Sequence, residues 1–244
     1  MTAAGRTTPL VVAVDGPSAA GKGTLARRIA EHFNLAFLDT GLIYRAVGAR
    51  LLRAGRDPGD EAAAVAAARE VGLDELDAPE LRADAVAQAA SRVAAIPAVR
   101  AALLAVQRRF AADPPAGPRG PVAGAVLDGR DIGTVVCPDA AVKLFVTASL
   151  ETRAERRHKE LLGQGRQSIY ARVLQDMSER DARDSGRAVA PLTPARDAVI
   201  VDSTALDKDA AFAVAARHVA RHAAWQKTAG HNRTAGIVRR KDRA

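Results

Sequence analysis

The sequence contains one cysteine in 244 residues, and aromatic residues make up only 3% of it. A single cysteine excludes an intramolecular disulfide and a cysteine-based zinc site, and it indicates a reducing compartment. We expect Cys137 to behave as a small apolar side chain. The scarcity of aromatic residues argues against a surface that stacks nucleic-acid bases, and it means that the core is aliphatic and rich in alanine.

Long apolar runs are missing as well. No stretch approaches the roughly 18 consecutive apolar residues that a membrane helix requires, and the first residues do not form a basic region followed by a long apolar segment. We therefore predict a soluble, cytoplasmic protein that makes no membrane contact. The length fits one large domain, or one domain with an insertion.

The positive charge is concentrated near the end of the chain. The formal net charge is +8, yet the residues from Arg217 onward hold eight Lys or Arg and one acid, Asp242. Residues 1–216 therefore carry an excess of a single positive charge. We expect residues 226–244 to form a disordered basic tail.

Short apolar segments alternate with helical patterns along the chain. This alternation predicts an α/β fold whose parallel sheet is covered on both faces. Region 60–112 has no strand signal and predicts inserted helices interrupted at Pro79 and Pro97, and segment 113–121 is rich in proline and predicts a loop. The expected strands cover residues 10–14, 36–38, 125–127, 142–146 and 198–201, and the expected helices include 22–33, 150–162 and 208–222.

A glycine-rich loop lies between the first expected strand and the first expected helix. In such a loop backbone N–H groups and the helix dipole bind phosphates, and Lys22 reaches the outer phosphates of a nucleoside triphosphate. Gly23 separates this lysine from the hydroxyl of Thr24, a variant typical of nucleotide kinases. The loop and the first helical turn consist of Gly16, Pro17, Ser18, Ala19, Ala20, Gly21, Lys22, Gly23 and Thr24.

Two more motifs follow strands. Thr40 and Arg45 come after the second strand and are spaced to bind another anion, although a helix cap and an ordinary exposed arginine explain them at least as well. Asp128 ends the third strand, where P-loop enzymes place the carboxylate that organises Mg²⁺ and its waters, and Arg130 can bind a phosphate through two nitrogens. A simple Asp-Gly turn is the alternative.

Arginine is dense late in the chain. Arg153, Arg157 and the run ERDARDSGR at 179–187 offer guanidinium groups that can close over a transferring phosphoryl group. Gly163 and Gly165 separate two helices, as suits a moving lid. Arginine outnumbers lysine thirty to six in the whole sequence, so composition alone explains part of this density.

The motifs VDGPSAAGKGT, FLDTGLIYRAV, AASRVAAIPAVR, LDGRDIGT, VKLFVTAS and ERDARDSGRAVAPL occur in this order. Through them the sequence resembles the bacterial cytidylate kinases over most of residues 10–220. The resemblance implies a three-layer P-loop kinase fold with strand order 2-3-1-4-5. It further implies one domain, residues 1–225, with a core at 9–45 and 98–222, a helical monophosphate-binding insertion at about 46–97 and a small lid at about 151–187.

The resemblance also implies a role for each motif residue. The loop from Gly16 to Thr24 would bind ATP, with Arg153 and Arg157 as lid residues over the triphosphate. Mg²⁺ would arrive with ATP and be held by Thr24 and, through water, by Asp128. The catalytic residues would be Lys22, Asp128, Arg130 and Arg180. The CMP-binding residues would be Thr40, Arg45, Arg130 and Arg180 at the acceptor phosphate, Ser91, Arg100 and Asp131 at the cytosine edge, and Asp184 and Arg187 at the sugar hydroxyls.

The chemistry of cytosine agrees with that assignment, because its N4 amine donates while N3 and O2 accept, and a carboxylate, a guanidinium and a hydroxyl complement this edge. The sequence departs from the family in two places. Thr40 stands where many members have serine, and segment 73–90 is short and helical where many members have extra small strands. The second departure bears on the shape of the acceptor site and on tolerance of dCMP or UMP.

We therefore expect a monomeric enzyme that transfers the γ-phosphoryl group of ATP to CMP and dCMP. One alternative is a different small-molecule P-loop kinase, acting on UMP or on a metabolite alcohol. Another is a nucleotide-dependent binding protein that applies its basic tail to nucleic acid or ribosomes, which would make the binding sensitive to salt.

Overall fold

The computed structural model describes residues 8–222 and contains a five-stranded parallel sheet of order β2-β3-β1-β4-β5. This confirms the predicted fold class and strand order. Each strand overlaps an apolar segment expected from the sequence. The strands are β1 (Leu10–Asp15), β2 (Ala36–Asp39), β3 (Gly124–Asp128), β4 (Val142–Thr147) and β5 (Val199–Asp202).

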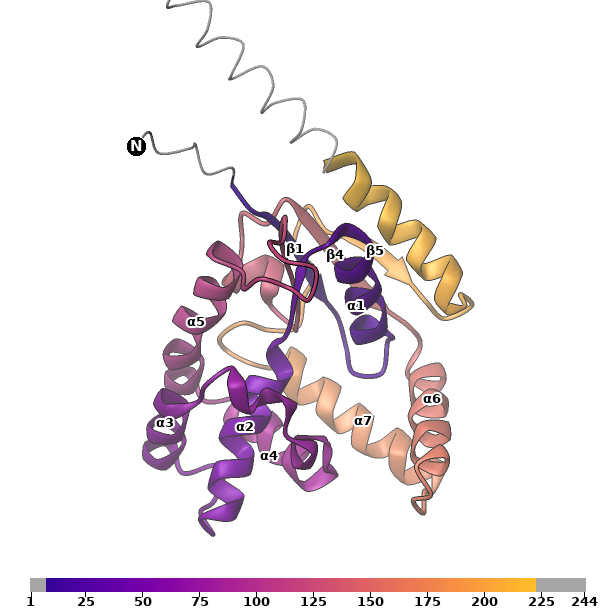
Figure 1. The fold of residues 1–244 in the computed structure, drawn as a ribbon. Helices are drawn as coiled ribbons and strands as arrows, with labels where there is room; N and C mark the ends of the chain where they lie inside the picture. The colour runs from indigo at the N-terminus through magenta and orange to yellow at the C-terminus, as the bar shows by residue number, and fades with distance from the viewer. Residues whose placement is uncertain (1–7, 223–244) are drawn as a thin grey trace, which may run out of the picture.

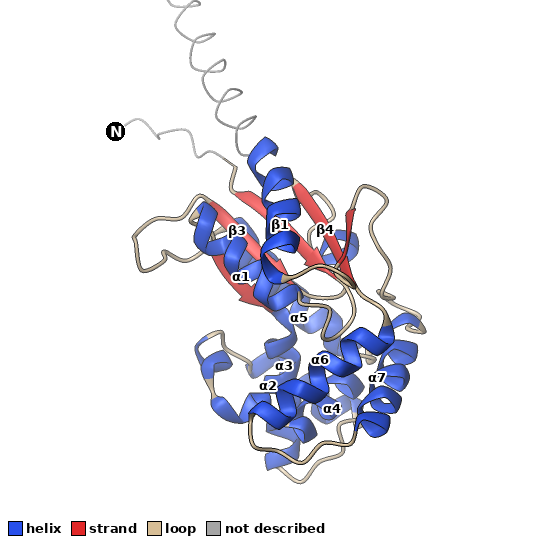
Figure 2. Cartoon of the chain, turned by 90° about the vertical axis from the view of Figure 1, so that its right-hand side faces the viewer, coloured by secondary structure: helices blue, strands red, loops and turns tan. Residues whose placement is uncertain are grey.

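The central strand β1 is buried on both faces, as its continuous apolar sequence requires. Val12 and Val14 point into one hydrophobic cluster, and Ala13, between them, points into the other. Helix α1 (Lys22–Phe33) and the helix over residues 208–222 cover the first face (Figures 1 and 2). Helices α2 (Thr40–Arg53) and α5 (Pro97–Ala112) pack on the second.

The region predicted to be a helical insertion is helical. Pro79 and Pro97 do not break helices from within but begin them, since proline fits the first turn, where its missing N–H is not needed. Within the described chain this region contains no strand. Its elements between α2 and α5 are α3 (Glu61–Glu70), the 3-10 turns η1 (Asp74–Asp77) and η2 (Pro79–Arg82), and α4 (Asp84–Val93).

Helices α6 (Leu150–Gly163) and α7 (Tyr170–Ser185) form a hairpin where the lid is predicted. Gly165 adopts a positive φ of 71° in the turn between them, a conformation that glycine adopts without strain. The hairpin has a small core of its own that packs against Ala19 of the glycine-rich loop. In both ribbon views this hairpin and the insertion helices lie beyond the same end of the sheet (Figures 1 and 2). The division into core, insertion and lid stays a prediction.

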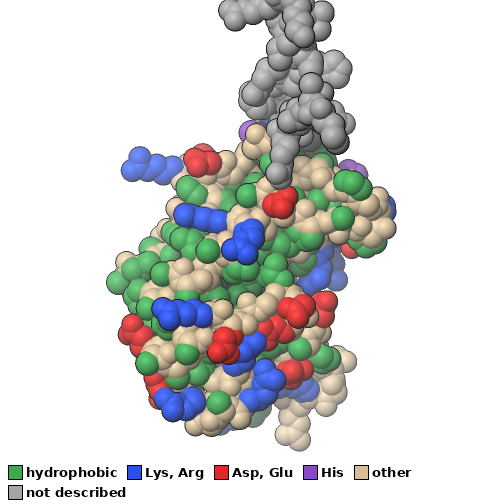
Figure 3. Space-filling view, turned by 60° about the vertical axis from the view of Figure 1, so that its left-hand side comes forward, with side chains coloured by type: hydrophobic (Ala, Val, Ile, Leu, Met, Phe, Trp, Pro, Cys, Tyr) green, Lys and Arg blue, Asp and Glu red, His purple; other side chains and the backbone are tan. Residues whose placement is uncertain are grey.

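Charged side chains of both signs are interspersed over the face drawn in Figure 3, rather than gathered by sign. Cys137 is partly buried, and burial raises the pKa of its thiol to about 11, which disfavours the reactive thiolate near neutral pH. The predicted basic tail at 226–244 lies outside the described residues.

No single helix within residues 8–222 is long and apolar enough to cross a membrane, although α4 and α5, bent by 102° at their junction, pass that test as a pair by length and composition.

Candidate active site

The glycine-rich loop connects β1 to α1 at the carboxyl edge of the sheet, and its backbone permits only glycine at its first position. Gly16 has a φ of 142°, and a Cβ there would lie 1.9 Å from the carbonyl oxygen of Val146. Gly21, directly before α1, has a φ of 87°, and as a glycine it has no side chain that could cap the backbone N–H groups of the first turn. The first turn of α1 therefore presents its backbone N–H groups and positive dipole end to an anion.

Lys22 points back into this loop. Its Nζ donates to the carbonyl oxygen of Pro17 at 2.8 Å, and its side chain is buried. Burial, followed by the positive charge of Arg130, lowers the pKa of Lys22 to about 8, while Asp128 acts in the opposite direction. The hydroxyl of Ser18 in the same loop is buried with no hydrogen-bond partner. The loop thus holds a buried cation and a hydroxyl that has no hydrogen-bond partner in the protein.

Asp128 ends β3 beside the start of α1. A Cβ on Gly23 would lie 3.3 Å from Asp128 Oδ2, so the carboxylate approaches the helix one residue before Thr24. Burial raises the pKa of Asp128 to about 6, and the charge of Lys22 opposes that shift. The Thr40 hydroxyl donates to the Asp128 carbonyl oxygen at 2.8 Å, so its proton is already engaged in the protein.

These residues fit a magnesium ion that arrives with a nucleotide. Mg²⁺ prefers oxygen ligands, keeps several waters and is usually held by one or two protein groups plus substrate phosphates. Thr24 is exposed and carries a hydroxyl, and the Asp128 carboxylate lies beside the preceding residue, Gly23. Among residues 8–222 no group of three or more His, Cys, Asp or Glu could hold a metal.

Asp184 on α7 is the centre of an arginine cluster. It is 1% exposed and accepts hydrogen bonds from Arg130 Nε at 3.1 Å and from Arg187 Nη2, and Arg180 Nε lies 3.9 Å from its Oδ2. Burial alone would raise the pKa of Asp184, but Arg130, Arg187 and Arg180 lower it. Three guanidiniums around one carboxylate leave an excess of two positive charges.

This cluster has unused donors. The Nε atoms of Arg180 and Arg187 are buried and have no hydrogen-bond partner. Burial, followed by repulsion from Arg130, lowers the pKa of Arg180 to about 10, so it remains charged near neutral pH. The charges of Arg130 and Arg180 both lower the pKa of Lys22, so the cluster lies near the glycine-rich loop. An anion with two charges would relieve the repulsion.

A second group of polar residues surrounds Arg100 of α5. Arg100 donates through Nη2 to Asp131, and both side chains are less than 10% exposed. The Arg100 guanidinium lies 5.5 Å from the centre of the Tyr44 ring. Ser91 on α4 is buried and accepts from Arg183 Nε at 3.4 Å. The three residues predicted to bind the cytosine edge thus come from α4, from α5 and from the loop after β3.

Three other predicted arginines have partners within the protein. Arg45 donates to the Leu81 carbonyl oxygen at 2.7 Å. Arg153 donates to Asp181 at 2.6 Å and to the Ser18 carbonyl oxygen at 3.4 Å, so it contacts the glycine-rich loop. The partners of Arg157 are Asp84 at 2.7 Å and Glu160 at 2.9 Å.

Arg157 therefore contacts the insertion rather than the loop. Asp84 also accepts from Arg166, so a single carboxylate on α4 joins two arginines of the hairpin. Sequence reasoning gave no role to Asp84. It placed Arg183 only in the arginine run that could close over a phosphoryl group and did not predict its contact with Ser91. Neither contact had a local signal, since each joins residues about 70 to 100 positions apart. Asp15, at the end of β1, also received no role, and its partners Ile132 and Gly133 lie 117 and 118 residues away in the sequence.

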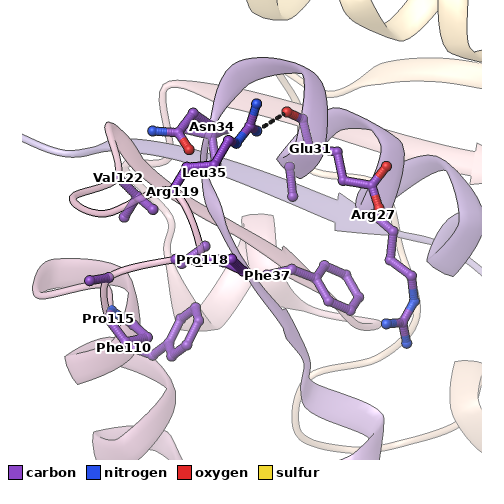
Figure 4. Close-up of a pocket in the computed structure, with 14 residues that line it drawn as sticks. Arg27, Glu31, Asn34, Leu35, Phe37, Phe110, Pro115, Pro118, Arg119 and Val122 are labelled. Carbon is purple, nitrogen blue, oxygen red and sulfur yellow. Dashed lines mark hydrogen bonds between the residues drawn. The ribbon is translucent and has the colours of Figure 1, made fainter.

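A separate cavity of about 560 Å³ lies beside the edge strand β2 (Figure 4). Its wall is mainly apolar and includes Leu35, Phe37, Phe110 and Val122. Arg119 closes one side and donates to the Glu31 carbonyl oxygen. None of the predicted site residues lines it. The cluster of charged groups with unused donors, and not this apolar hollow, has the chemistry that phosphate transfer requires.

Comparison with known proteins agrees with the motifs. The family model described as cytidylate kinase matches residues 12–220. A cytidylate kinase of Paramagnetospirillum magneticum is 64% identical over 205 residues, which cover 84% of this chain and 95% of that protein. Cytidylate kinases of Methylocella silvestris and Xanthobacter autotrophicus are each 57% identical over 206 residues, covering 84% of this chain and 92% and 95% of theirs.

Proposed function

Because the chain belongs to the cytidylate kinase family, we propose that it transfers the γ-phosphoryl group of ATP to the 5′-phosphate of CMP and of dCMP, giving ADP and a nucleoside diphosphate. The observation that carries this proposal is that Lys22 of the glycine-rich loop lies near enough to Arg130 and Arg180, which surround Asp184, for their charges to lower its pKa. A triphosphate on the glycine-rich loop and a monophosphate on the arginine cluster would therefore be neighbours.

The reaction needs alignment and charge neutralisation more than proton transfer. A phosphate monoester oxygen is already anionic near pH 7 and attacks the γ-phosphorus directly, while the bond from that phosphorus to the β-γ bridging oxygen breaks. Lys22 would neutralise charge on the donor phosphates. Arg130 and Arg180 would hold the acceptor oxygen in line and stabilise charge on the transferring group.

Magnesium would be held by Thr24 and, through water, by Asp128. When bound, it supplies positive charge to the β- and γ-phosphate oxygens. Thr40 and Arg45 would add contacts to the acceptor phosphate. For Arg45 this requires that the guanidinium bind the phosphate in addition to the Leu81 carbonyl oxygen, or that it break its hydrogen bond to that oxygen.

The α6–α7 hairpin would act as the lid. Arg153 already reaches the backbone of the glycine-rich loop at Ser18, which supports a role over the triphosphate. Arg157 would have to leave Asp84 to join it. Closure of the hairpin would keep water from the γ-phosphate and so suppress hydrolysis of ATP.

The base would be recognised by Asp131, Arg100 and Ser91. The Asp131 carboxylate would accept from the N4 amine of cytosine, and Arg100 and Ser91 would donate to its acceptors. Asp184 and Arg187 would bind the sugar hydroxyls. We further propose that the enzyme acts as a cytoplasmic monomer.

A coupled assay of ADP release tests the proposal. With ATP and Mg²⁺ present, CMP, dCMP, UMP, AMP and GMP are compared in parallel. We expect turnover with CMP and dCMP and little with the other three. Turnover mainly with another monophosphate would refute the assignment of the base-binding residues and leave the kinase chemistry intact. No turnover with any of the five would refute the proposed function.

Asp131→Asn should reduce discrimination between CMP and UMP. Uracil presents an oxygen where cytosine presents the N4 amine, so it repels the carboxylate but can accept from an asparagine amide. We expect the ratio of kcat/KM for CMP to that for UMP to fall about 10- to 100-fold. Steady-state kinetics with both acceptors measures it. Asp209→Asn, a change at a side chain 87% exposed, is the matched control. An unchanged ratio would exclude Asp131 from base recognition.

The pH dependence should reveal the charge of Lys22. Its pKa in the free enzyme is about 8, so the ammonium is charged below that pH and loses its proton as the pH rises through it. We therefore expect kcat/KM for ATP, which reports the free enzyme, to fall about tenfold per pH unit above this value. Lys22→Arg should remove this alkaline fall, since an arginine stays protonated. A wild-type profile flat to pH 10 would contradict the prediction.

A further inference from the structure

Asp15 is a buried carboxylate to which the proposed mechanism gives no role. It is the last residue of β1, directly before the glycine-rich loop, and it is 5% exposed. Its Oδ1 accepts from the backbone N–H of Ile132, and its Oδ2 accepts from that of Gly133, both at 2.7 Å. These two groups begin the short helix η3 (Ile132–Val136), so Asp15 caps a helix that belongs to another part of the chain.

The bonds from β1 hold a very short loop at both ends. Before the loop, Gly129 N–H donates to the Val14 carbonyl oxygen at 2.9 Å. After it, the Asp15 carboxylate holds Ile132 and Gly133. Only two residues lie between these attachments, and they are Arg130 and Asp131. The proposed phosphate-binding and base-binding side chains therefore start from backbone that two adjacent β1 residues fix.

No local group replaces this cap. Asp131, which precedes η3, makes no side-chain hydrogen bond to the helix start, and its own carboxylate accepts from Arg100 instead. The loop also has little spare room, since a Cβ on Gly129 would lie 2.6 Å from Ile132 Cδ1. A change at Asp15 would therefore be transmitted to the backbone of Asp131 rather than absorbed.

Burying the Asp15 carboxylate costs free energy. Burial raises the pKa of Asp15 to about 6, the two N–H groups of Gly133 and Ile132 oppose that shift, and the nearby charges of Asp131 and Asp128 add to it. Burying a charge beside two like charges costs free energy that two backbone hydrogen bonds offset only in part. Global stability alone is a weak reason for a charged group here.

We propose that Asp15 is a positioning residue that holds Arg130 and Asp131 in register with the glycine-rich loop, so that recognition of the cytosine base depends on a side chain that touches neither substrate. This inference rests on the proposed function. It predicts that a change at Asp15 affects the acceptor site more than the donor site, although Asp15 adjoins the donor loop in sequence.

Asp15→Asn tests the proposal. The amide keeps one acceptor oxygen but turns an NH₂ group toward the other backbone N–H, which replaces a hydrogen bond by a contact between two donors. We expect KM for CMP to rise about tenfold or more and the CMP-to-UMP ratio of kcat/KM to fall at least about fivefold. KM for ATP should change by less than about threefold. Asp209→Asn should change none of these quantities.

Two results would overturn the proposal. One is a loss of kcat that is equal for CMP and UMP, with KM for CMP and the CMP-to-UMP ratio unchanged, because a purely structural role predicts that. The other is a result of amide hydrogen exchange on the wild-type protein. This measurement tests the proposal even if the variant does not fold. Ile132 and Gly133 should exchange slowly, as capped amides do, and exchange as fast as in an exposed loop would refute the cap. If wild type does not phosphorylate CMP, the proposed function fails, and this exchange still decides whether Asp15 holds the helix.

Discussion

Lys22→Ala is expected to lower kcat by about three powers of ten, close to 4 kcal/mol of transition-state stabilisation. The ammonium is the only lysine charge at the glycine-rich loop within the described residues, and its position is fixed by the bond to the Pro17 carbonyl oxygen. Charge that develops on the phosphate oxygens during transfer would lose this partner in a partly desolvated site, where a charge interaction is strongest.

The variant should keep its fold, because burial and repulsion from Arg130 and Arg180 outweigh the attraction of Asp128 and Asp39 for the Lys22 charge and lower its pKa. Thermal unfolding should therefore give a Tm close to that of wild type. Lys208→Ala, which changes an exposed lysine, is the matched control. If Lys22→Ala kept most of its turnover at normal Tm, the assignment of the loop to ATP would be wrong.

The strands and the glycine-rich loop were predictable because their signals are local. An apolar run such as residues 10–14 is long enough to fill a buried strand and too short for a helix. Gly16, Gly21 and Lys22 are needed together by one loop geometry. The order of the strands came from the resemblance and not from the apolar runs, since those runs contain no information about which strand lies beside which.

The partners of the site residues were not predictable from the sequence. A motif identifies Thr40 as a hydroxyl near a phosphate, but the acceptor of its proton is a carbonyl group 88 residues away. Asp84 and Asp15 were missed for a related reason. Their roles depend on contacts between segments that approach each other only in the folded chain, 73 to 118 residues apart.

Arg180→Met should separate activity from stability. The Arg180 side chain is one-quarter exposed, its Nε is buried without a hydrogen-bond partner, and its link to Asp184 is a distant 3.9 Å. Burial, followed by repulsion from Arg130, lowers the pKa of Arg180, so the folded protein holds this charge at a cost. Asp184 keeps Arg130 and Arg187 as partners after the change. We therefore expect a Tm equal to or above that of wild type.

The same change should lower kcat/KM for CMP about 10²- to 10³-fold, because the unused donor and charge of Arg180 would serve the acceptor phosphate and its transition state. Arg172→Met, at an exposed position of the same helix, should leave both Tm and kinetics unchanged. A lower Tm accompanied by normal turnover would mean that Arg180 stabilises α7 and takes no part in catalysis. A cation with a buried, unpartnered donor that is costly to the fold and necessary for turnover is the pattern expected of a functional site.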